Sequence, residues 1–138
     1  MKKVSLLLLT LAFVSIYAQN SVVDFKTKNK TNQLERTEML DLMRSKIKSE
    51  LKFDVQFVVQ HFKVSGDFAW LKADAKRLDG KEFVFENEGE YDCCHVEALF
   101  GKVKGKWTLV EGNYFSTDVW WSDIEKKFPS ANKLIFKD

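Results

Sequence analysis

Hydrophobic and polar residues alternate on both sides of a turn rich in glycine and lysine, between Gly101 and Gly105. Because successive side chains of a strand point to opposite faces of a sheet, this pattern predicts an antiparallel hairpin. A loop of two or four residues gathers the large apolar side chains on one face, whereas three or five residues exchange the faces. We prefer the even loop, and its apolar face then consists of Val96, Ala98, Phe100, Trp107 and Leu109. The opposite, mixed face consists of His95, Glu97, Leu99, Val110 and Tyr114.

Apolar residues after Asn32 recur at spacings of three and four, which predicts an amphipathic helix with Asn32 as its N-cap. Glu35, three residues later, completes a capping-box pattern. Arg36 stands at the head of the apolar stripe, where it could pair with a carboxylate or line a pocket. The simpler interpretation is that the aliphatic part of the Arg36 side chain covers the rim of the core. The remaining residues of the stripe are Leu40, Met43, Ile47 and Leu51.

The segment from Phe53 to Val64 is the longest strand-like run, and apolar residues fall on both of its faces. Such a pattern is typical of a central strand that is covered, at least in part, on both sides. The turn Ser65-Gly66-Asp67 and a second strand from Phe68 to Lys76 follow. Asp79-Gly80 is a hairpin signal that introduces a shorter predicted strand from Glu82 to Glu86.

The chain beyond the glycine-rich hairpin predicts one short helix and one short strand. Ser116–Asp118 supplies cap residues for a helix from Val119 to Phe128, and Pro129 follows where a helix stop is expected. Leu134 to Phe136 is expected to dock as a last short strand.

The order of these elements indicates an α+β fold, in which an amphipathic helix packs on a curved antiparallel sheet of four or five strands, with a short C-terminal helix. Cystatin-like and nuclear-transport-factor-like rolls have this architecture. An open arrangement of helix on sheet without curvature is the alternative. A chain of 138 residues has the length of one domain, which we place at residues 32–138.

Residues 1–18 have the features of a secretory signal peptide. Lys2 and Lys3 follow Met1, an apolar run extends from Val4 to Tyr17, and the small residue Ala18 comes last. The run is short for a membrane span, so we expect cleavage after Ala18 rather than an uncleaved anchor. Residues 19–31 are polar and rich in lysine, and we expect them to form a mobile N-terminal segment. The sequence therefore predicts a secreted or periplasmic protein with no membrane span after cleavage.

Removal of the leader changes the charge of the chain. The full sequence has 22 basic and 20 acidic residues, whereas cleavage would remove two lysines and leave 20 of each. Because nucleic-acid binding needs a concentrated basic surface, we expect no nucleic-acid partner. A chain of this length with 12 Phe and 4 Trp can bury a core without disulfide staples.

Cys93 and Cys94 are the only cysteines. Neighbouring strand residues point apart, so we expect a small buried residue at Cys94 and a free thiol at Cys93, with no obligatory intrachain disulfide. A vicinal disulfide, an intermolecular bridge and a Cys-Cys-His metal site are alternatives. The acidic loop with Glu86, Glu88, Glu90 and Asp92 lacks the full signature of a calcium loop, and a solvated turn explains it better. We therefore predict no metal and no cofactor.

The mixed sheet face is the best candidate for chemistry. His95, Glu97 and Tyr114 could share it, and with Arg36 they could form a polar pocket for a carboxylate or for acid–base work. A half-exposed polar sheet face is the simpler interpretation. His61 falls by parity on the face of Phe53 to Val59, as a satisfied histidine at a sheet edge.

Two adjacent tryptophans are the other binding candidates. Trp120 and Trp121 would lie about 100° apart on a helix, so one can be buried while the other forms a platform for a ligand or partner. The weak candidates for ligand binding are therefore Arg36, His95, Glu97, Tyr114, Trp120 and Trp121.

Several short motifs resemble those of a group of small secreted bacterial proteins to which no catalytic residues are assigned. The resemblance covers most of the expected mature chain and implies secretion, and it transfers no catalytic role to any residue. The motifs are Arg36 with Leu40 and Arg44, Phe57–Val59, Gly66–Leu71, Asp79-Gly80, His95–Phe100, Gly105–Trp107 and Thr117–Trp121.

The absence of a nucleophile, metal or phosphate motif favours a non-enzymatic secreted domain that binds a small ligand, a peptide or a protein partner. One alternative is a small roll-type enzyme with Arg36, His95 and Glu97 as acid–base residues between helix and sheet. Another is a dimerising structural protein of the cell envelope. In the preferred register we expect Arg36 to lie away from His95 and Glu97.

Overall fold

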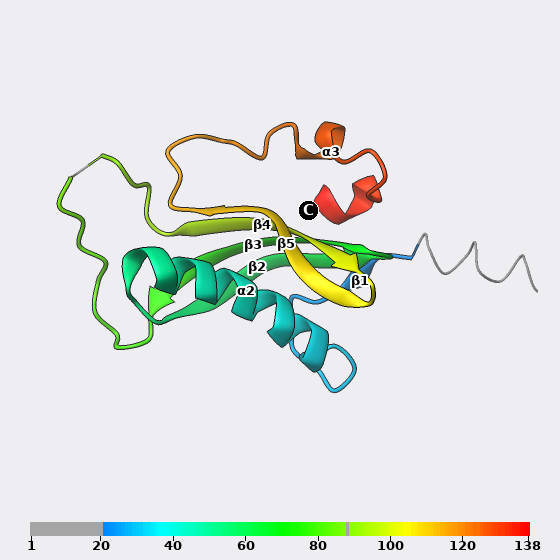
Figure 1. Cartoon of the computed structure of the whole chain (residues 1–138), viewed down its shortest axis with the longest axis horizontal. Helices are drawn as coiled ribbons and strands as arrows, with labels where there is room; N and C mark the ends of the chain where they lie inside the picture. The colour runs from blue at the N-terminus through cyan, green and yellow to red at the C-terminus, as the bar shows by residue number, and fades with distance from the viewer. Residues whose placement is uncertain (1–20, 88) are drawn as a thin grey trace, which may run out of the picture.

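The computed structural model describes residues 21–87 and 89–138 (Figure 1). The signal peptide and its cleavage after Ala18 lie outside the described residues. The strands are β1 (Val23–Asp24), β2 (Val55–Ser65), β3 (Phe68–Arg77), β4 (His95–Val103) and β5 (Lys106–Tyr114). The helices are α2 (Gln33–Leu51), α3 (Ile124–Lys127) and the 3₁₀ helix η1 (Lys133–Phe136). The predicted α+β class with an antiparallel sheet is confirmed.

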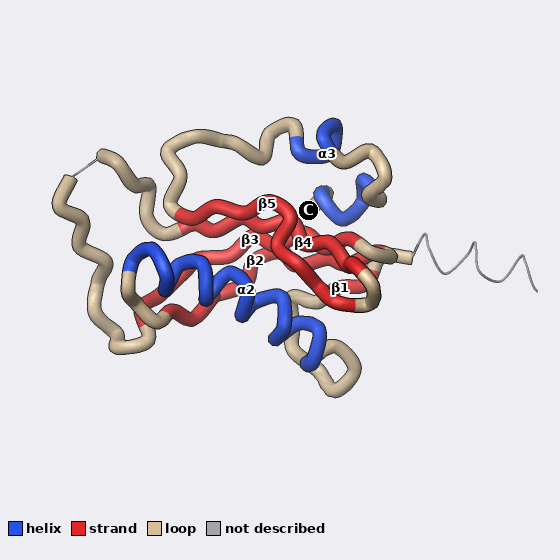
Figure 2. The backbone as a smooth tube through the Cα atoms, viewed as in Figure 1, coloured by secondary structure: helices blue, strands red, loops and turns tan. Residues whose placement is uncertain are grey.

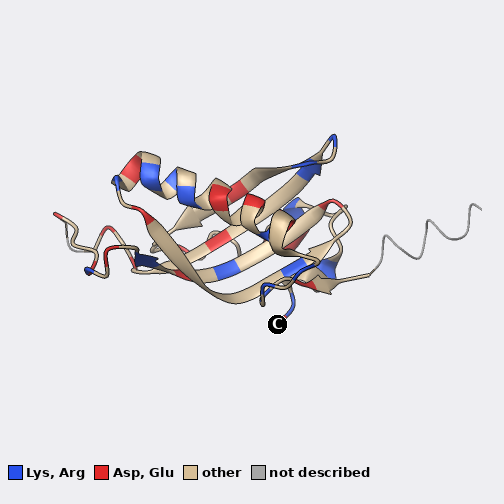
Figure 3. Cartoon of the chain, turned by 90° about the horizontal axis from the view of Figure 1, so that it is seen from below, with Lys and Arg blue, Asp and Glu red and all other residues tan. Residues whose placement is uncertain are grey.

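The five strands form one sheet in the order β1-β2-β3-β4-β5, and every neighbouring pair is antiparallel. Helix α2 covers one face of the sheet, which we call the helix face, while α3 and η1 lie on the opposite, outer face (Figures 1 and 2). Acidic and basic residues are interspersed along α2 and the strands (Figure 3).

The space between α2 and the sheet is filled by side chains. Met39, Met43 and Ile47 of α2 have no exposed surface, and Phe100 and Trp107 of the sheet are at most 1% exposed. Full burial of one such side chain stabilises the fold by about 1.5–3 kcal/mol. This interior is therefore a packed core.

A two-residue turn joins β4 to β5, because Val103 pairs with Lys106. Its residues Lys104 and Gly105 both have positive φ, 50° and 76°, as a type I′ turn requires. The predicted even loop is confirmed, and Phe100 pairs with Leu109 on the helix face.

One unpaired residue in each of two strands changes which way the later side chains face. In β2 the register shifts at Gln60, so Phe62 and Val64 join Phe57 and Val59 on the helix face. The expected cover on both sides is present in part, because η1 packs over the outer face at His61. His61 itself faces outward, so its assignment to the face of Phe53 to Val59 is wrong. In β5 the register shifts at Val110.

The predicted strand from Glu82 to Glu86 is absent from the described structure. Both edges of β3 are already paired, with β2 and with β4, so this segment has no strand edge to join. Its aromatic rings instead pack on Phe115, with ring centroids 5.0 Å away for Phe83 and 5.8 Å for Phe85. The fifth strand of the sheet is β1.

The C-terminal elements also differ from their predictions. Only Ile124–Lys127 of the helix expected from Val119 to Phe128 is helical, and residues 120–123 form turns. In a regular helix the adjacent indoles of Trp120 and Trp121 would point about 100° apart. The turns instead allow both indoles to reach the sheet. Leu134 to Phe136 belongs to η1 rather than to a strand.

The predicted capping box is wrong. Asn32 makes no side-chain capping bond to α2; its amide donates to the Thr27 carbonyl and its oxygen accepts from the Asn29 N–H, both at 2.9 Å. Glu35 reaches across to the β4–β5 hairpin instead. Upstream of Asn29, within the segment expected to be mobile, β1 pairs with β2 and Phe25 is buried.

Candidate functional site

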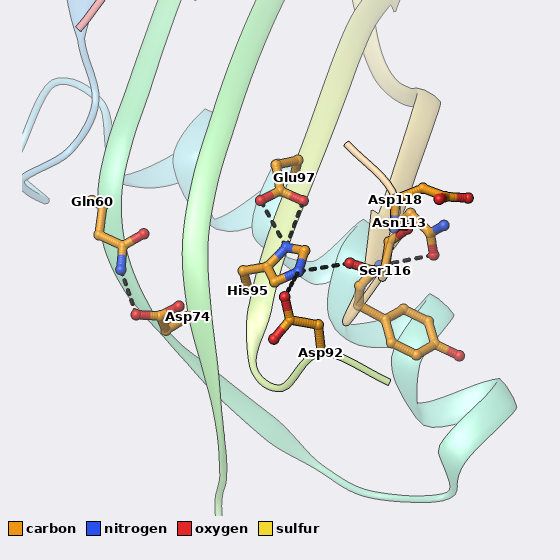
Figure 4. A network of polar contacts seen from close by, with 9 residues as sticks. Gln60, Asp74, Asp92, His95, Glu97, Asn113, Ser116 and Asp118 are labelled. Atoms are coloured by element: carbon orange, nitrogen blue, oxygen red, sulfur yellow. Dashed lines mark hydrogen bonds and ion pairs between the residues drawn. The ribbon is translucent and has the colours of Figure 1, made fainter. Parts of the chain in front are cut away.

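A polar cluster on the outer face is built around His95 at the start of β4 (Figure 4). The ring Nδ1 lies 2.9 and 3.0 Å from the two carboxyl oxygens of Glu97, two residues along the strand and therefore on the same face. The ring Nε2 donates to the Ser116 carbonyl at 2.9 Å, and a carboxyl oxygen of Asp92 lies 3.7 Å from it. His95 therefore fastens the segment after β5 to the sheet.

Burial dominates the electrostatics of this cluster. Glu97 is 5% exposed, and burial raises the pKa of its carboxyl, an effect that the hydrogen bond from His95 partly offsets. Because a carbonyl only accepts, Nε2 must carry a proton. Both nitrogens of the ring are therefore occupied within the protein.

The two candidate tryptophans lie beside this cluster. The ring of Trp121 meets that of His95 edge-on, with centroids 5.5 Å apart. Trp120 packs edge-on against Trp70 of β3 at 6.1 Å and against Trp121 at 5.9 Å. Trp120 and Trp121 are both half-buried, so they cover the sheet more than they present a free platform.

The structure places the other two candidates elsewhere. Because of the irregularity at Val110, Tyr114 pairs with Val96 and faces α2, where its hydroxyl hydrogen-bonds Glu50. Burial and this carboxylate raise the pKa of Tyr114. The expected sharing of one face by Tyr114 and His95 is therefore wrong.

Arg36 belongs to the opposite side of the molecule from the polar cluster. Its guanidinium donates to the carbonyls of Phe25, at 2.8 Å, and Lys26, at 3.1 Å. It therefore holds the segment after β1 against α2. The expectation that Arg36 lies away from His95 and Glu97 agrees with these contacts.

Cys93 and Cys94 are joined to each other by a disulfide. The argument from strand alternation does not apply, because both residues precede β4 in a turn. The expectation of two separate thiols is therefore wrong.

A surface pocket of about 420 Å³ lies beside this disulfide, and we call it the disulfide pocket. It forms where the ends of β2 and β3 meet the cysteines, and the Ala75 N–H donates to the Cys94 carbonyl at 2.8 Å. Figure 1 shows the segment between β3 and β4 extending beyond the sheet at the end away from α3. The pocket is lined by Gln56, Ala75, Lys76, Arg77, Gly80, Lys81, Glu82, Phe83, Cys93 and Cys94.

The sequence contains a partial signal for this pocket. Asp79-Gly80 marks the turn and the cysteine pair marks the opposite wall, but only the pairing of β3 with β4 brings the two together. None of the six residues chosen from the sequence lines it.

A larger hollow of about 680 Å³ lies between the β2–β3 turn and residues 130–134. Two polar side chains on its wall, Asn132 and Ser65, are bonded to each other at 3.2 Å. Its single charged residue is Asp67. We interpret this hollow as the joint between the sheet and the C-terminal segment.

Two further searches concern metals and membranes. In the part of the chain that the structure describes, no group of three or more His, Cys, Asp or Glu side chains could hold a metal ion. Over residues 21–87 and 89–138, no helix has the length and apolar character to cross a membrane.

Comparison with known proteins adds no relative to this description. No family model matches the chain, and neither the curated proteins nor the solved structures contain a match.

Proposed function

We propose that this protein is a secreted or periplasmic domain without enzymatic activity that binds a small molecule in the disulfide pocket. The pocket itself carries the proposal. Its volume falls within the range of small-molecule sites, and its wall combines an aromatic ring, a disulfide and a few polar groups. The predicted leader and the disulfide support an oxidising compartment outside the cytoplasm.

The contacts of His95 in the polar cluster argue against a role as a general base. A general base needs a nitrogen or oxygen free to reach the substrate proton. In His95 one ring nitrogen is held by Glu97 and the other by the Ser116 carbonyl. The packed interior under α2 also counts against the alternative of a roll-type active site between helix and sheet.

We also propose that the helix and sheet form a roll of the cystatin-like or nuclear-transport-factor-like kind. The support is the order of elements, with one long helix followed by four long strands in antiparallel succession. An experimental structure tests this, since a flat sheet under α2 would contradict it.

Native mass spectrometry of the protein purified from its own host tests the binding function. We expect a fraction with added mass that is lost on denaturation. Gln56→Trp should remove it by filling the pocket, because Gln56 lines the wall and is exposed. Val58→Trp is the matched control, since Val58 is 47% exposed on the same strand but outside the pocket.

Three results would count against the proposal. The wild-type protein could carry only its own mass, the Gln56 variant could keep the ligand, or both variants could lose it equally. A dimer mass that persists on dilution would instead favour the dimerising alternative.

A further inference from the structure

We propose that the disulfide pocket selects an organic anion, namely a carboxylate that carries one or two apolar rings. This inference rests on the binding function proposed above and adds the chemical class of the ligand.

Three cationic residues line the pocket against one acidic residue. The cations are Lys76, Arg77 and Lys81, and the acid is Glu82. The acidic residues Glu86, Glu90 and Asp92 of the following loop are not part of the wall. The local charge therefore favours an anion over a cation.

Arg77 is already engaged. Its Nε donates to Asp79 at 2.9 Å, Nη2 bonds the second oxygen of the same carboxylate, and the guanidinium lies 4.0 Å from the ring centre of Phe53. This bidentate pair and the stacking fix Arg77 as part of the wall.

Lys76 and Lys81 have ammonium groups that remain available. Neither side chain makes a hydrogen bond or ion pair with any described residue. Asp79 lies near Lys81, but Arg77 occupies both of its oxygens. An ammonium group is a mobile point charge with three donors, which suits a ligand carboxylate at the pocket mouth.

The opposite part of the wall is apolar and held in place. Phe83 contacts Phe53 at 6.0 Å and Phe115 at 5.0 Å between ring centroids, so its ring is fixed from two sides. Cys93, Cys94 and Ala75 complete this wall. Sulfur near an aromatic ring is a favourable contact, and the volume of about 420 Å³ suits a small ring system.

Three probes of one shape test the inference on the full, disulfide-bonded chain. We would titrate 2-naphthoate, neutral 2-naphthamide and cationic 2-naphthylmethylammonium into ¹⁵N-labelled protein and follow the backbone amides of the pocket. We expect naphthoate to bind about tenfold more tightly than the amide, the effect of one charge-assisted contact of about 1.4 kcal/mol. The ammonium probe should bind most weakly.

Substitution of the two free lysines should remove the preference. In the double variant Lys76→Gln with Lys81→Gln, the affinities for naphthoate and naphthamide should lie within about twofold of each other, because only the charged contact is lost. Lys104→Gln with Lys106→Gln is the matched control, because both lysines are exposed and lie outside the pocket wall. This control should keep the wild-type preference.

The outcomes separate the inference from the binding function. Equal binding of naphthoate and naphthamide, tighter binding of the ammonium, or an unchanged preference in the Lys76/Lys81 variant overturns the anion inference and leaves the binding function standing. Failure of naphthoate to shift the pocket amides also overturns it. The binding function fails separately, if the protein from its host carries no ligand.

Discussion

Glu35 connects the first turn of α2 to the β4–β5 hairpin. One of its carboxyl oxygens accepts from Lys102 Nζ at 2.8 Å and from Trp107 Nε1 at 2.6 Å. The hydrogen bond from Lys102, and then that from Trp107, lower the pKa of Glu35 below its ordinary 4.5 against the opposing effect of burial. This carboxylate therefore stabilises the fold only while it is ionised.

Glu35→Gln should lower the free energy of unfolding at neutral pH by about 0.5–1 kcal/mol, a modest value because the side chain is 45% exposed. A carboxyl with a lowered pKa stabilises above its unfolded value and loses this contribution as the pH falls through the folded value. The variant and wild type should therefore converge in acid, as urea melts at the two pH values would show. Glu38→Gln, on the same helix, is the control, and a pH-independent difference for Glu35→Gln would contradict the linkage.

Trp107 should be the largest single anchor of the hairpin, since it is 1% exposed between the sheet and α2. Trp107→Ala should cost about 3–5 kcal/mol of unfolding free energy, through lost burial and the cavity left behind. Trp107→Phe keeps most of the apolar area and should cost less than half as much. A loss under about 1 kcal/mol for the alanine variant in a urea melt would show that the side chain is not a core residue.

At the scale of elements, the C-terminal segment behaves as a cover for the outer face. Ile124, Ala131 and Ile135 pack with Trp70 and Leu99 in a second buried cluster. The Ile135 carbonyl also accepts from His61 Nε2 at 2.6 Å. Apolar packing and one buried hydrogen bond therefore hold η1 on the sheet.

Two adjacent residues of η1 test this docking. Ile135 is fully buried, whereas Leu134 is 58% exposed. Ile135→Ala should cost about 2–4 kcal/mol, while Leu134→Ala should cost less than about 0.5 kcal/mol. Thermal melts followed by tryptophan fluorescence would measure both, because Trp70 lies under η1. Equal losses for the two variants would mean that η1 is not docked as described.

The faces of β4 and the length of the turn after it could be predicted, whereas the strand irregularities could not. Alternation in Val96 to Phe100 and the Lys104-Gly105 turn determine the faces from neighbouring residues alone. Gln60 and Val110 have no partner residue in the neighbouring strand, which is a property of the pairing between two strands. The sequence of one strand alone does not indicate where such an irregularity falls. This is why His61 and Tyr114 were assigned to the wrong faces.

At the scale of the whole molecule, acid acts on the outer face of the sheet through His61. His61 on the outer face is 7% exposed, and burial is the main cause of its lowered pKa. Lys63 and Lys72 also lower this pKa, whereas the Ile135 carbonyl and Asp138 raise it. The folded chain therefore takes up a proton at His61 less readily than the unfolded chain.

Wild-type stability should fall, relative to His61→Gln, as the pH drops below the ordinary histidine value of 6.5 toward the lowered pKa. A group with a lowered pKa in the folded state binds more protons in the unfolded chain, so unfolding is favoured over this range. The glutamine amide can still donate to the Ile135 carbonyl but does not titrate there. Urea melts across the range should show the difference, and parallel curves for the two proteins would contradict it.

The candidate site was harder to predict than the fold, because its residues lie far apart in the sequence. The fold class follows from local periodicity in α2 and in the strands. The disulfide pocket needs Gln56, Lys76 and Cys93 to meet, and these come from three segments whose approach depends on strand pairing and on the conformation at the cysteines. His95 and Glu97 were found because a strand places positions two apart on one face.

The cover on the outer face has a consequence for how the chain is made. All five strands precede α3 and η1 in the sequence, so during synthesis the sheet can pair before its cover exists. Until then Trp70 and Leu99 remain open to solvent, and they would be an attractive surface for a chaperone or for another unfinished chain. Docking of α3 and η1 would therefore reduce the tendency of the chain to aggregate as well as complete its fold.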